Sequence, residues 1–219
     1  MAFTAQDVKA LREKTGVGMM ECKKALVEAD GDMDKAVDFL RERGLAAAAK
    51  KATRIAAEGV VLPYYDAEAK KGVVVEVNSE TDFVAKNEKF MNFVEGVAKT
   101  ILATNPADVE ALKEEKFDGT DRTVTETLND LVLSIGENMK VRRFERMDGI
   151  VSTYIHGGGS VGVMVGFDVA DESKAATAEF DAMGKNVAMQ IAAMSPAYLD
   201  EASVPAEVVE HEKTILAAQ

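Results

Sequence analysis

The sequence predicts an α+β protein in which a small helical module precedes a core of two related units. Two observations support this prediction. Residues 1–44 contain three short stretches whose apolar residues recur at helical spacing. The rest of the chain contains an internal repeat with a constant offset of 90 residues. Each copy has two alternating apolar runs and then an amphipathic stretch, so each predicts a strand hairpin followed by a helix.

Residues 1–44 are expected to form three helices packed as a small bundle. Thr4 can cap the first helix, Asp32 can cap the third, and Gly44 is expected to close the third. The apolar positions are Val8 and Leu11, then Cys22, Ala25, Leu26 and Ala29, then Met33, Ala36, Val37 and Leu40. A bundle of this size is marginally stable alone and is typical of a recognition module. The alanine-rich residues 45–57 predict a helical connector.

The internal repeat aligns residues 58–106 with residues 148–196 without a gap. Matching pairs include Gly59 and Gly149, Val61 and Val151, Tyr64 and Tyr154, Gly72 and Gly162, Phe90 and Phe180, Ile101 and Ile191, and Pro106 and Pro196. Between the copies, residues 106–115 and 124–135 predict helices and residues 141–147 a further strand. We therefore expect a first core subdomain over 58–139 with a helical insertion, and a second over 140–202. Residues 203–219 predict the start of a C-terminal helix that is cut short.

Composition limits the classes of partner and site. The net charge of −12 argues against a partner bound mainly through phosphates, so no nucleic acid is expected. No stretch is apolar enough to cross a bilayer, and the amphipathic opening does not resemble a secretory signal. The single cysteine, Cys22, excludes an internal disulfide and fits a reducing cytoplasm. One cysteine and two histidines leave no zinc site of the usual kind, and no cofactor is expected.

The connection between the hairpin and the helix of the first copy carries unusual apolar bulk. It reads N-S-E-T-D-F-V-A-K-N over residues 78–87, with Phe83 and Val84 among polar neighbours. The second copy has Ser173 where the first has Phe83, so the repeated scaffold does not need an aromatic side chain there. Two interpretations stay open. Phe83 and Val84 either pack onto their own helix, or they form an exposed tip, flanked by a carboxylate, that inserts into another protein.

A second motif, H-G-G-G-S-V-G over residues 156–162, resembles the oxyanion hole and nucleophile elbow of serine hydrolases. A nucleophile elbow joins a strand to a helix, whereas this segment joins two predicted strands. A glycine-rich hairpin turn explains the same residues. We expect no covalent chemistry, and a hydrolase that uses His156 and Ser160 remains the competing interpretation.

Four segments resemble the elongation factor Ts family. The two most specific are L-R-E-K-T-G-V-G-M-M-E-C-K-K-A-L over 11–26 and the N-S-E-T-D-F-V-A-K-N segment over 78–87. S-T-Y-I-H-G-G-G-S-V-G-V-M over 152–164 and S-V-P-A-E-V-V-E over 203–210 also match. The resemblance implies a guanine-nucleotide exchange factor for elongation factor Tu, in the cytoplasm. It also implies an N-terminal module similar to a ubiquitin-associated (UBA) domain, followed by two related subdomains.

The resemblance also implies which residues contact the partner. By analogy with the family, Thr81, Asp82, Phe83 and Val84 enter the GTPase domain of elongation factor Tu beside its magnesium site. Leu11, Arg12, Met19 and Met20 touch the same domain. The alternative for the two methionines is that one of them packs in the bundle core, because only one can face inward. His156 and Gly157 meet another domain of the partner, or else form a solvent-exposed turn. A UBA-like adaptor without exchange activity is a further alternative.

Overall fold

The computed structural model describes residues 3–218, and its first three helices form the expected bundle. Helix α1 (Ala5–Thr15) is capped by Thr4, whose hydroxyl accepts the Asp7 amide, and α2 (Met19–Glu28) follows. Helix α3 (Met33–Lys51) is capped by the Asp32 carboxylate. The bundle has its own apolar cluster, composed of Val8, Leu11, Val17, Cys22, Ala25, Leu26, Ala29, Ala36 and Leu40.

The expectation that Gly44 closes the third helix is wrong, because α3 continues to Lys51 through much of the predicted connector. Gly44 is buried where α3 crosses α7 (Val124–Ile135). A Cβ atom at residue 44 would lie 3.3 Å from the Asn129 carbonyl oxygen. The glycine therefore marks a close helix crossing, and the following alanines have the helix propensity to extend α3 past it.

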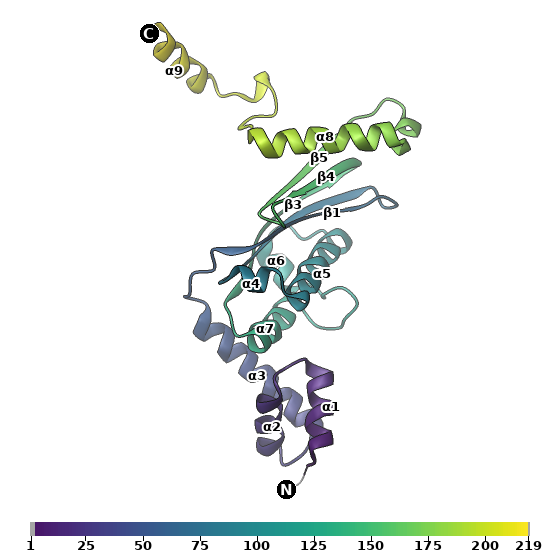
Figure 1. Ribbon diagram of the computed structural model, residues 1–219, viewed down its shortest axis with the longest axis vertical. Helices are drawn as coiled ribbons and strands as arrows, with labels where there is room; N and C mark the ends of the chain where they lie inside the picture. The colour runs from purple at the N-terminus through teal and green to yellow at the C-terminus, as the bar shows by residue number, and fades with distance from the viewer. Residues whose placement is uncertain (1–2, 219) are drawn as a thin grey trace.

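The first sheet is antiparallel, in the order β1 (Glu58–Asp66), β2 (Lys71–Ser79), β3 (Met139–Asp148). Strand β3 contains the residues expected as a further strand and pairs with β2 of the first unit. Helix α5 (Glu88–Thr104) covers one face of this sheet, with α6 (Val109–Glu114) and α7 beside it (Figure 1). The main apolar cluster lies between them and includes Val73, Val75, Val77, Phe90, Val94, Val97, Ile101 and Leu112.

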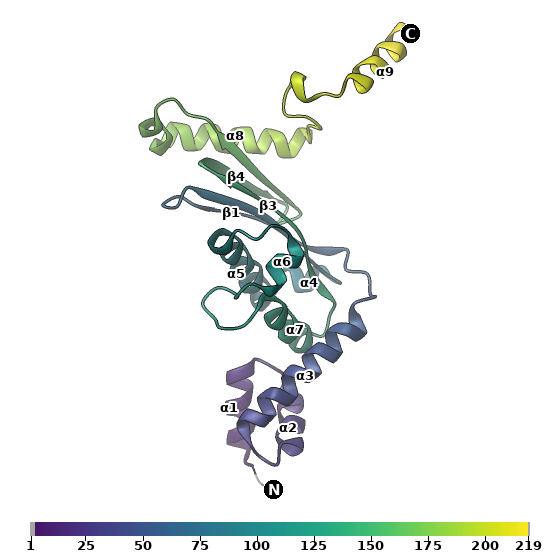
Figure 2. The same cartoon turned by 180° about the vertical axis from the view of Figure 1, so that it is seen from behind.

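The second unit is a hairpin of β4 (Ile150–His156) and β5 (Val161–Phe167), covered by helix α8 (Ala178–Met194). The ring of Phe180 in α8 meets the Phe167 ring edge to face, with centroids 5.3 Å apart. Figure 2 shows the layers from behind: α5 to α7, then the first sheet, then the β4–β5 hairpin, then α8. Helices α5 and α8 each have 17 residues and start 90 residues apart.

The two units pack with their sheets in close contact. A Cβ atom at Gly162 would lie 2.7 Å from a Val61 methyl carbon, and one at Gly72 would lie 3.1 Å from a Val151 methyl carbon. The Val61 amide also donates a 2.8 Å hydrogen bond to the Gly159 carbonyl oxygen. The glycines at these repeat positions thus allow one sheet to approach the other.

Two short 3-10 turns flank helix α8, and a last helix follows them. The 3-10 turn η1 (Glu172–Ala176) precedes α8, and η2 (Glu201–Ser203) precedes α9 (Ala206–Ala217), which is the predicted C-terminal helix. Helix α9 extends away from α8 at the far end of the molecule from the N-terminal bundle (Figure 1). Within residues 3–218, no helix combines the length and apolar character needed to cross a membrane.

Candidate partner-binding site

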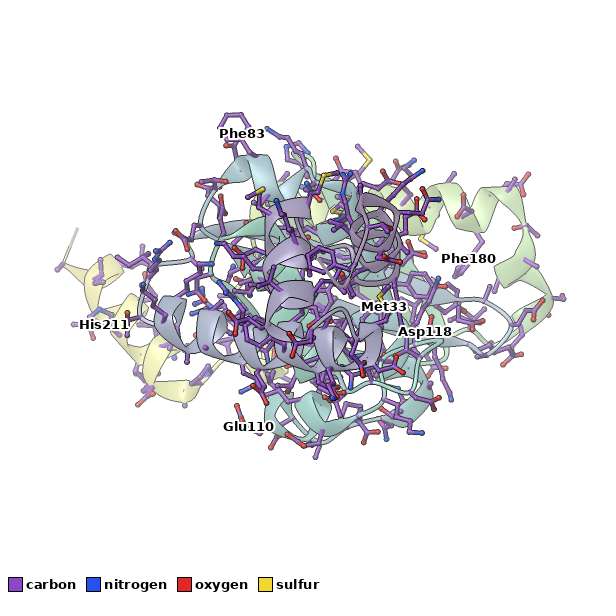
Figure 3. All side chains as sticks on the ribbon, turned by 90° about the horizontal axis from the view of Figure 1, so that it is seen from below. Met33, Phe83, Glu110, Asp118, Phe180 and His211 are labelled. Carbon is purple, nitrogen blue, oxygen red and sulfur yellow. The ribbon has the colours of Figure 1, made fainter. Side chains whose placement is uncertain are left out.

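The connection between β2 and α5 forms a protruding tip. Its centre is the one-turn helix α4 (Asp82–Ala85), and Asn87 then caps α5 by accepting the Lys89 amide at 2.9 Å. The Phe83 side chain is 81% exposed, and its ring projects from the edge of the molecule in Figure 3. A ring this exposed does not pack onto its own helix, so the structure favours the interpretation of Phe83 as an apolar tip.

Val84, the next residue of α4, is only 6% exposed. It belongs to the main apolar cluster, so the expectation that Val84 shares the exposed tip is wrong. Successive helical residues point about 100° apart, so a single turn cannot present both side chains to the same surroundings. The two interpretations left open by the sequence each describe one residue: Val84 packs onto its own unit and Phe83 faces outward.

Asp82 supplies a negative charge beside the exposed ring. Its carboxylate accepts a 2.8 Å hydrogen bond from the Lys86 ammonium group, one helical turn away. This hydrogen bond, with the charge of Lys86, lowers the pKa of Asp82 below its ordinary value. Asp82 is therefore ionised at neutral pH, and both side chains remain accessible to a partner.

Thr81 is fixed at the base of the tip. Its amide and its hydroxyl donate to the two oxygens of the Glu137 carboxylate, at 3.0 and 2.8 Å. The neighbouring Glu80 carboxylate accepts the amide of Asn138 at 2.6 Å. Glu80, Glu137 and Asn138 are site residues that the sequence reasoning missed. Glu137 and Asn138 lie more than 50 residues after Glu80 and Thr81, and no periodic pattern connects the two segments.

The N-terminal bundle presents its two methionines together. Met19 is 52% exposed and Met20 is 65% exposed, so neither packs in the bundle core and the alternative of one inward-facing methionine is excluded. Val17 closes the end of the bundle core and Cys22 is the first core residue of α2, which leaves the first turn of α2 outside. Arg12 is exposed. Leu11 is fully buried in the bundle core, so its side chain offers no surface to a partner.

The segment that leads into Met19 is held close to the start of α5. The Lys89 ammonium group donates to the Gly16 carbonyl oxygen at 2.8 Å, and the Ser134 hydroxyl donates to the same oxygen at 3.0 Å. Lys89 follows the tip by only a few residues. The structure thus connects the methionine pair and the Phe83 tip through this short contact. In the other unit, His156 is exposed at the end of β4 and Gly157 is exposed at the start of the β4–β5 turn.

Comparison with known proteins identifies the family. A family model described as elongation factor TS matches residues 80–219. The chain is 54% identical to elongation factor Ts of Clostridium perfringens (strain 13), over 99% of this chain and 71% of that relative. It is 52% identical to elongation factor Ts of Syntrophotalea carbinolica (99% and 71%) and 51% identical to that of Symbiobacterium thermophilum (99% and 70%). The chain belongs to the elongation factor Ts family. The resemblance indicated by its motifs is confirmed.

In this chain the H-G-G-G-S-V-G segment spans the turn between β4 and β5 and includes the adjoining strand ends. The Ser160 hydroxyl donates to the His156 backbone carbonyl at 3.2 Å, while the His156 ring nitrogen Nδ1 is 3.0 Å from the Tyr154 hydroxyl. No bond joins the Ser160 hydroxyl to the imidazole, as a serine nucleophile and its base require. Among residues 3–218, no group of three or more acidic, histidine or cysteine side chains is arranged to hold a metal ion.

Proposed function

We propose that this chain binds elongation factor Tu, in the GDP-bound and nucleotide-free states, and promotes GDP release so that GTP can bind. The observation that carries the proposal is the exposed Phe83 ring. It is followed by the buried Val84 and stands two residues after Thr81, which is hydrogen-bonded to Glu137. Family membership supports the choice of partner. Such a role needs no covalent chemistry and is exercised in the cytoplasm.

The proposed mechanism uses the aromatic ring and its acidic neighbour. Phe83 inserts between helices of the partner's GTPase domain and shifts the segment that holds the magnesium water shell. Asp82 competes for the polar groups that orient those waters. Once the metal is lost, the GDP phosphates lose their main countercharge and the nucleotide dissociates. Binding of this chain and binding of GDP thus weaken each other by the same factor.

Phe83 cannot provide this coupling alone. A roughly ten-thousandfold weakening of GDP binding needs about 5.5 kcal/mol of differential binding. Burying one aromatic side chain contributes about 1.5–3 kcal/mol. We propose that Arg12, Met19 and Met20 in the bundle and His156 with Gly157 in the second unit contribute the rest. The paired methionines are flexible and polarisable, which suits an adaptable apolar contact.

We further propose that the N-terminal bundle is UBA-like and that the core arose as two copies of one unit. The equal lengths of α5 and α8 at an offset of 90 residues support duplication. Their ends agree as well, because Asn105 and Ser195 both cap a helix with left-handed backbone, at φ 50° and 46°. The proposed boundary between the two core subdomains, at residue 140, falls at the start of β3. Strand β3 nevertheless pairs with β2 of the first unit.

The test is stopped-flow release of a fluorescent GDP analogue from elongation factor Tu. We expect the wild-type chain to accelerate release and Phe83→Ala to lower that acceleration by roughly 10- to 100-fold, as expected for one buried aromatic contact. Leu199→Ala is the matched control, because Leu199 is 95% exposed, apolar and in the other unit. Leu199→Ala should behave as wild type.

Three outcomes would contradict the proposal. Release at the spontaneous rate with the wild-type chain would exclude exchange activity. Release unaffected by the double substitution Asp82→Ala and Phe83→Ala would favour a simple adaptor. Release abolished by Ser160→Ala in a folded chain would favour the hydrolase interpretation.

A further inference from the structure

Reciprocal hydrogen bonds between two short segments support the base of the tip. On one side are Glu80 and Thr81, which follow β2, and on the other are Glu137 and Asn138, which precede β3. Thr81 donates to Glu137 through its amide and hydroxyl, and the Asn138 amide donates to Glu80. The last backbone pair of the β2–β3 ladder is Ser79 with Met139. Two carboxylates thus continue the contact between the strands beyond the point where the backbone ladder ends.

Thr81 occupies the N-cap position of α4 but does not cap it. A threonine at this position usually accepts an amide of its own helix, whereas α4 has no side-chain cap and the Thr81 hydroxyl bonds to Glu137 instead. The only amide accepted by the Thr81 carbonyl from α4 is that of Ala85, at 3.4 Å. A four-residue helix is not stable by itself. Its orientation therefore depends on Val84 at one side and on the contact with Glu137 at its start.

The carboxylates of Glu137 and Glu80 are positioned by the residues around them. Gly136 ends α7 with φ 94°, a left-handed conformation that turns the chain toward the end of β2. Asn138 is buried, and its side-chain amide donates to the Arg54 carbonyl oxygen at 2.8 Å. Glu80 is also within 3.5 Å of the Arg54 guanidinium group. The base of the tip is thus connected to α7 and to the segment before β1.

We propose that Glu137, with Glu80, is a positioning residue that holds the Phe83 tip in its binding orientation before the partner arrives. This inference rests on the proposed exchange function. A tip ordered in advance loses less conformational entropy on binding, so more of the contact energy is available to displace the nucleotide. Glu137 acts through Thr81 and need not touch the partner.

The experiment compares three substitutions of Glu137 in the full chain. Glu137→Ala removes both acceptors, and Glu137→Asp keeps the charge but is too short to reach both Thr81 donors. We expect each to lower the second-order rate constant for GDP release by about tenfold, the effect of about 1.4 kcal/mol from lost charged hydrogen bonds. Glu137→Gln can accept the Thr81 amide and donate to its hydroxyl, so it should stay within about threefold of wild type. Glu110→Ala is the control, since Glu110 lies on the opposite edge from Phe83 (Figure 3).

A double-mutant cycle separates positioning from general damage. If Glu137 acts through the tip, Glu137→Ala should have no further effect when Phe83 is already alanine. Losses that add in the double mutant would overturn the proposal, as would an unchanged rate in the single mutant. If Glu137→Ala does not fold, the same cycle is carried out with Glu137→Asp.

Amide hydrogen exchange of the free chain gives a readout that does not depend on the partner. We expect faster exchange at residues 81–85 in Glu137→Ala and wild-type protection in Glu137→Gln. Unchanged protection in Glu137→Ala would overturn the positioning role, even if GDP release were slowed. Failure of the proposed function would look different, because the wild-type chain would then not accelerate GDP release at all.

Discussion

At the scale of single residues, the tip shows how adjacent side chains divide structural and binding roles. Val84 packs into the main cluster, Phe83 projects into solvent, and Asp82 is ionised beside it. A large exposed aromatic side chain contributes little to folding, because its surface is accessible to water in both states. Loss of the Val84 side chain should therefore lower the stability of the fold, whereas loss of the Phe83 ring should leave stability nearly unchanged.

We predict opposite effects for two alanine substitutions in the tip. Val84→Ala should lower the free energy of unfolding by about 1–3 kcal/mol, through lost burial and the cavity it leaves. Phe83→Ala should change it by less than about 0.5 kcal/mol. Urea denaturation followed by circular dichroism measures both. Equal destabilisation would mean that the Phe83 ring packs onto the chain in solution.

A second residue-scale prediction concerns Glu76 on β2, whose side chain is largely buried. Burial acts to raise the pKa of Glu76, but hydrogen bonds from Arg143 at 2.7 Å and Asn78 at 3.1 Å, and the charges of Arg143 and Arg142, lower it overall. The unfolded chain then binds the proton more readily than the folded chain. The Glu76 carboxylate thus stabilises the fold above the ordinary glutamate pKa of about 4.3, and this contribution is lost as the pH falls through the lower folded value.

Glu76→Gln should therefore cost about 1 kcal/mol at neutral pH and progressively less in acid. Urea titrations at a series of pH values measure the difference from wild type. Glu145→Gln, at an exposed position on β3, is the control. A Glu76→Gln deficit that stays constant from neutral pH to below the folded pKa would contradict the assignment.

At the scale of elements, the sequence predicted the ends of a helix correctly where capping residues beside the helix determine them. Residues 124–135 were predicted as a helix and form α7, which is bounded by a Thr123 capping box and by Gly136. The Gly44 stop signal failed because a tertiary contact, the crossing of α3 over α7, requires a glycine within a helix. An exposed Phe83 was one of two interpretations that the sequence left open, suggested by Ser173 at the aligned position 90 residues later. The anchors of the tip could not be predicted, because a contact between Thr81 and Glu137 leaves no trace in local sequence.

Gly96 in α5 is a second glycine that a tertiary contact requires within a helix, and it can be tested by substitution. Replacing glycine by alanine inside a helix usually stabilises it by about 1 kcal/mol. Here a Cβ atom would meet the Phe117 ring, with one ring carbon at 2.8 Å, while that ring stacks on Phe93 with centroids 5.5 Å apart. We predict that Gly96→Ala is destabilising by about 1–3 kcal/mol, as expected for overpacking.

Phe117→Ala should remove the clash and reverse the sign. In that background Gly96→Ala should be neutral or stabilising, and thermal unfolding of the four variants gives the coupling energy. Additive effects of the two substitutions would show that the Phe117 ring does not clash with a side chain at residue 96.

At the scale of the whole molecule, α7 connects two candidate contact regions: the methionine pair of the N-terminal bundle and the Phe83 tip. Helix α3 packs along it, Leu133 joins the apolar cluster of the bundle, and Ser134 bonds to the Gly16 carbonyl just before Met19. At its C-terminal end, Gly136 leads into Glu137, which holds Thr81. One helix thus positions both the methionine pair and the tip. Loosening the bundle from α7 should weaken partner binding even where every contact residue is intact.

Gly44 is the position at which to test this connection. Gly44→Ala requires a shift of only a few tenths of an ångström at the Asn129 carbonyl and gains helix propensity, so its net effect should be small. Gly44→Val adds two methyl groups in the crossing and should separate α3 from α7. We predict a loss of about 1–3 kcal/mol of stability, with the bundle melting in a separate, earlier calorimetric transition. Ala46→Val, at an exposed position of α3, controls for the lower helix propensity of valine. A single transition for Gly44→Val, with the midpoint of the Ala46→Val control, would mean that the bundle does not depend on the crossing for its orientation.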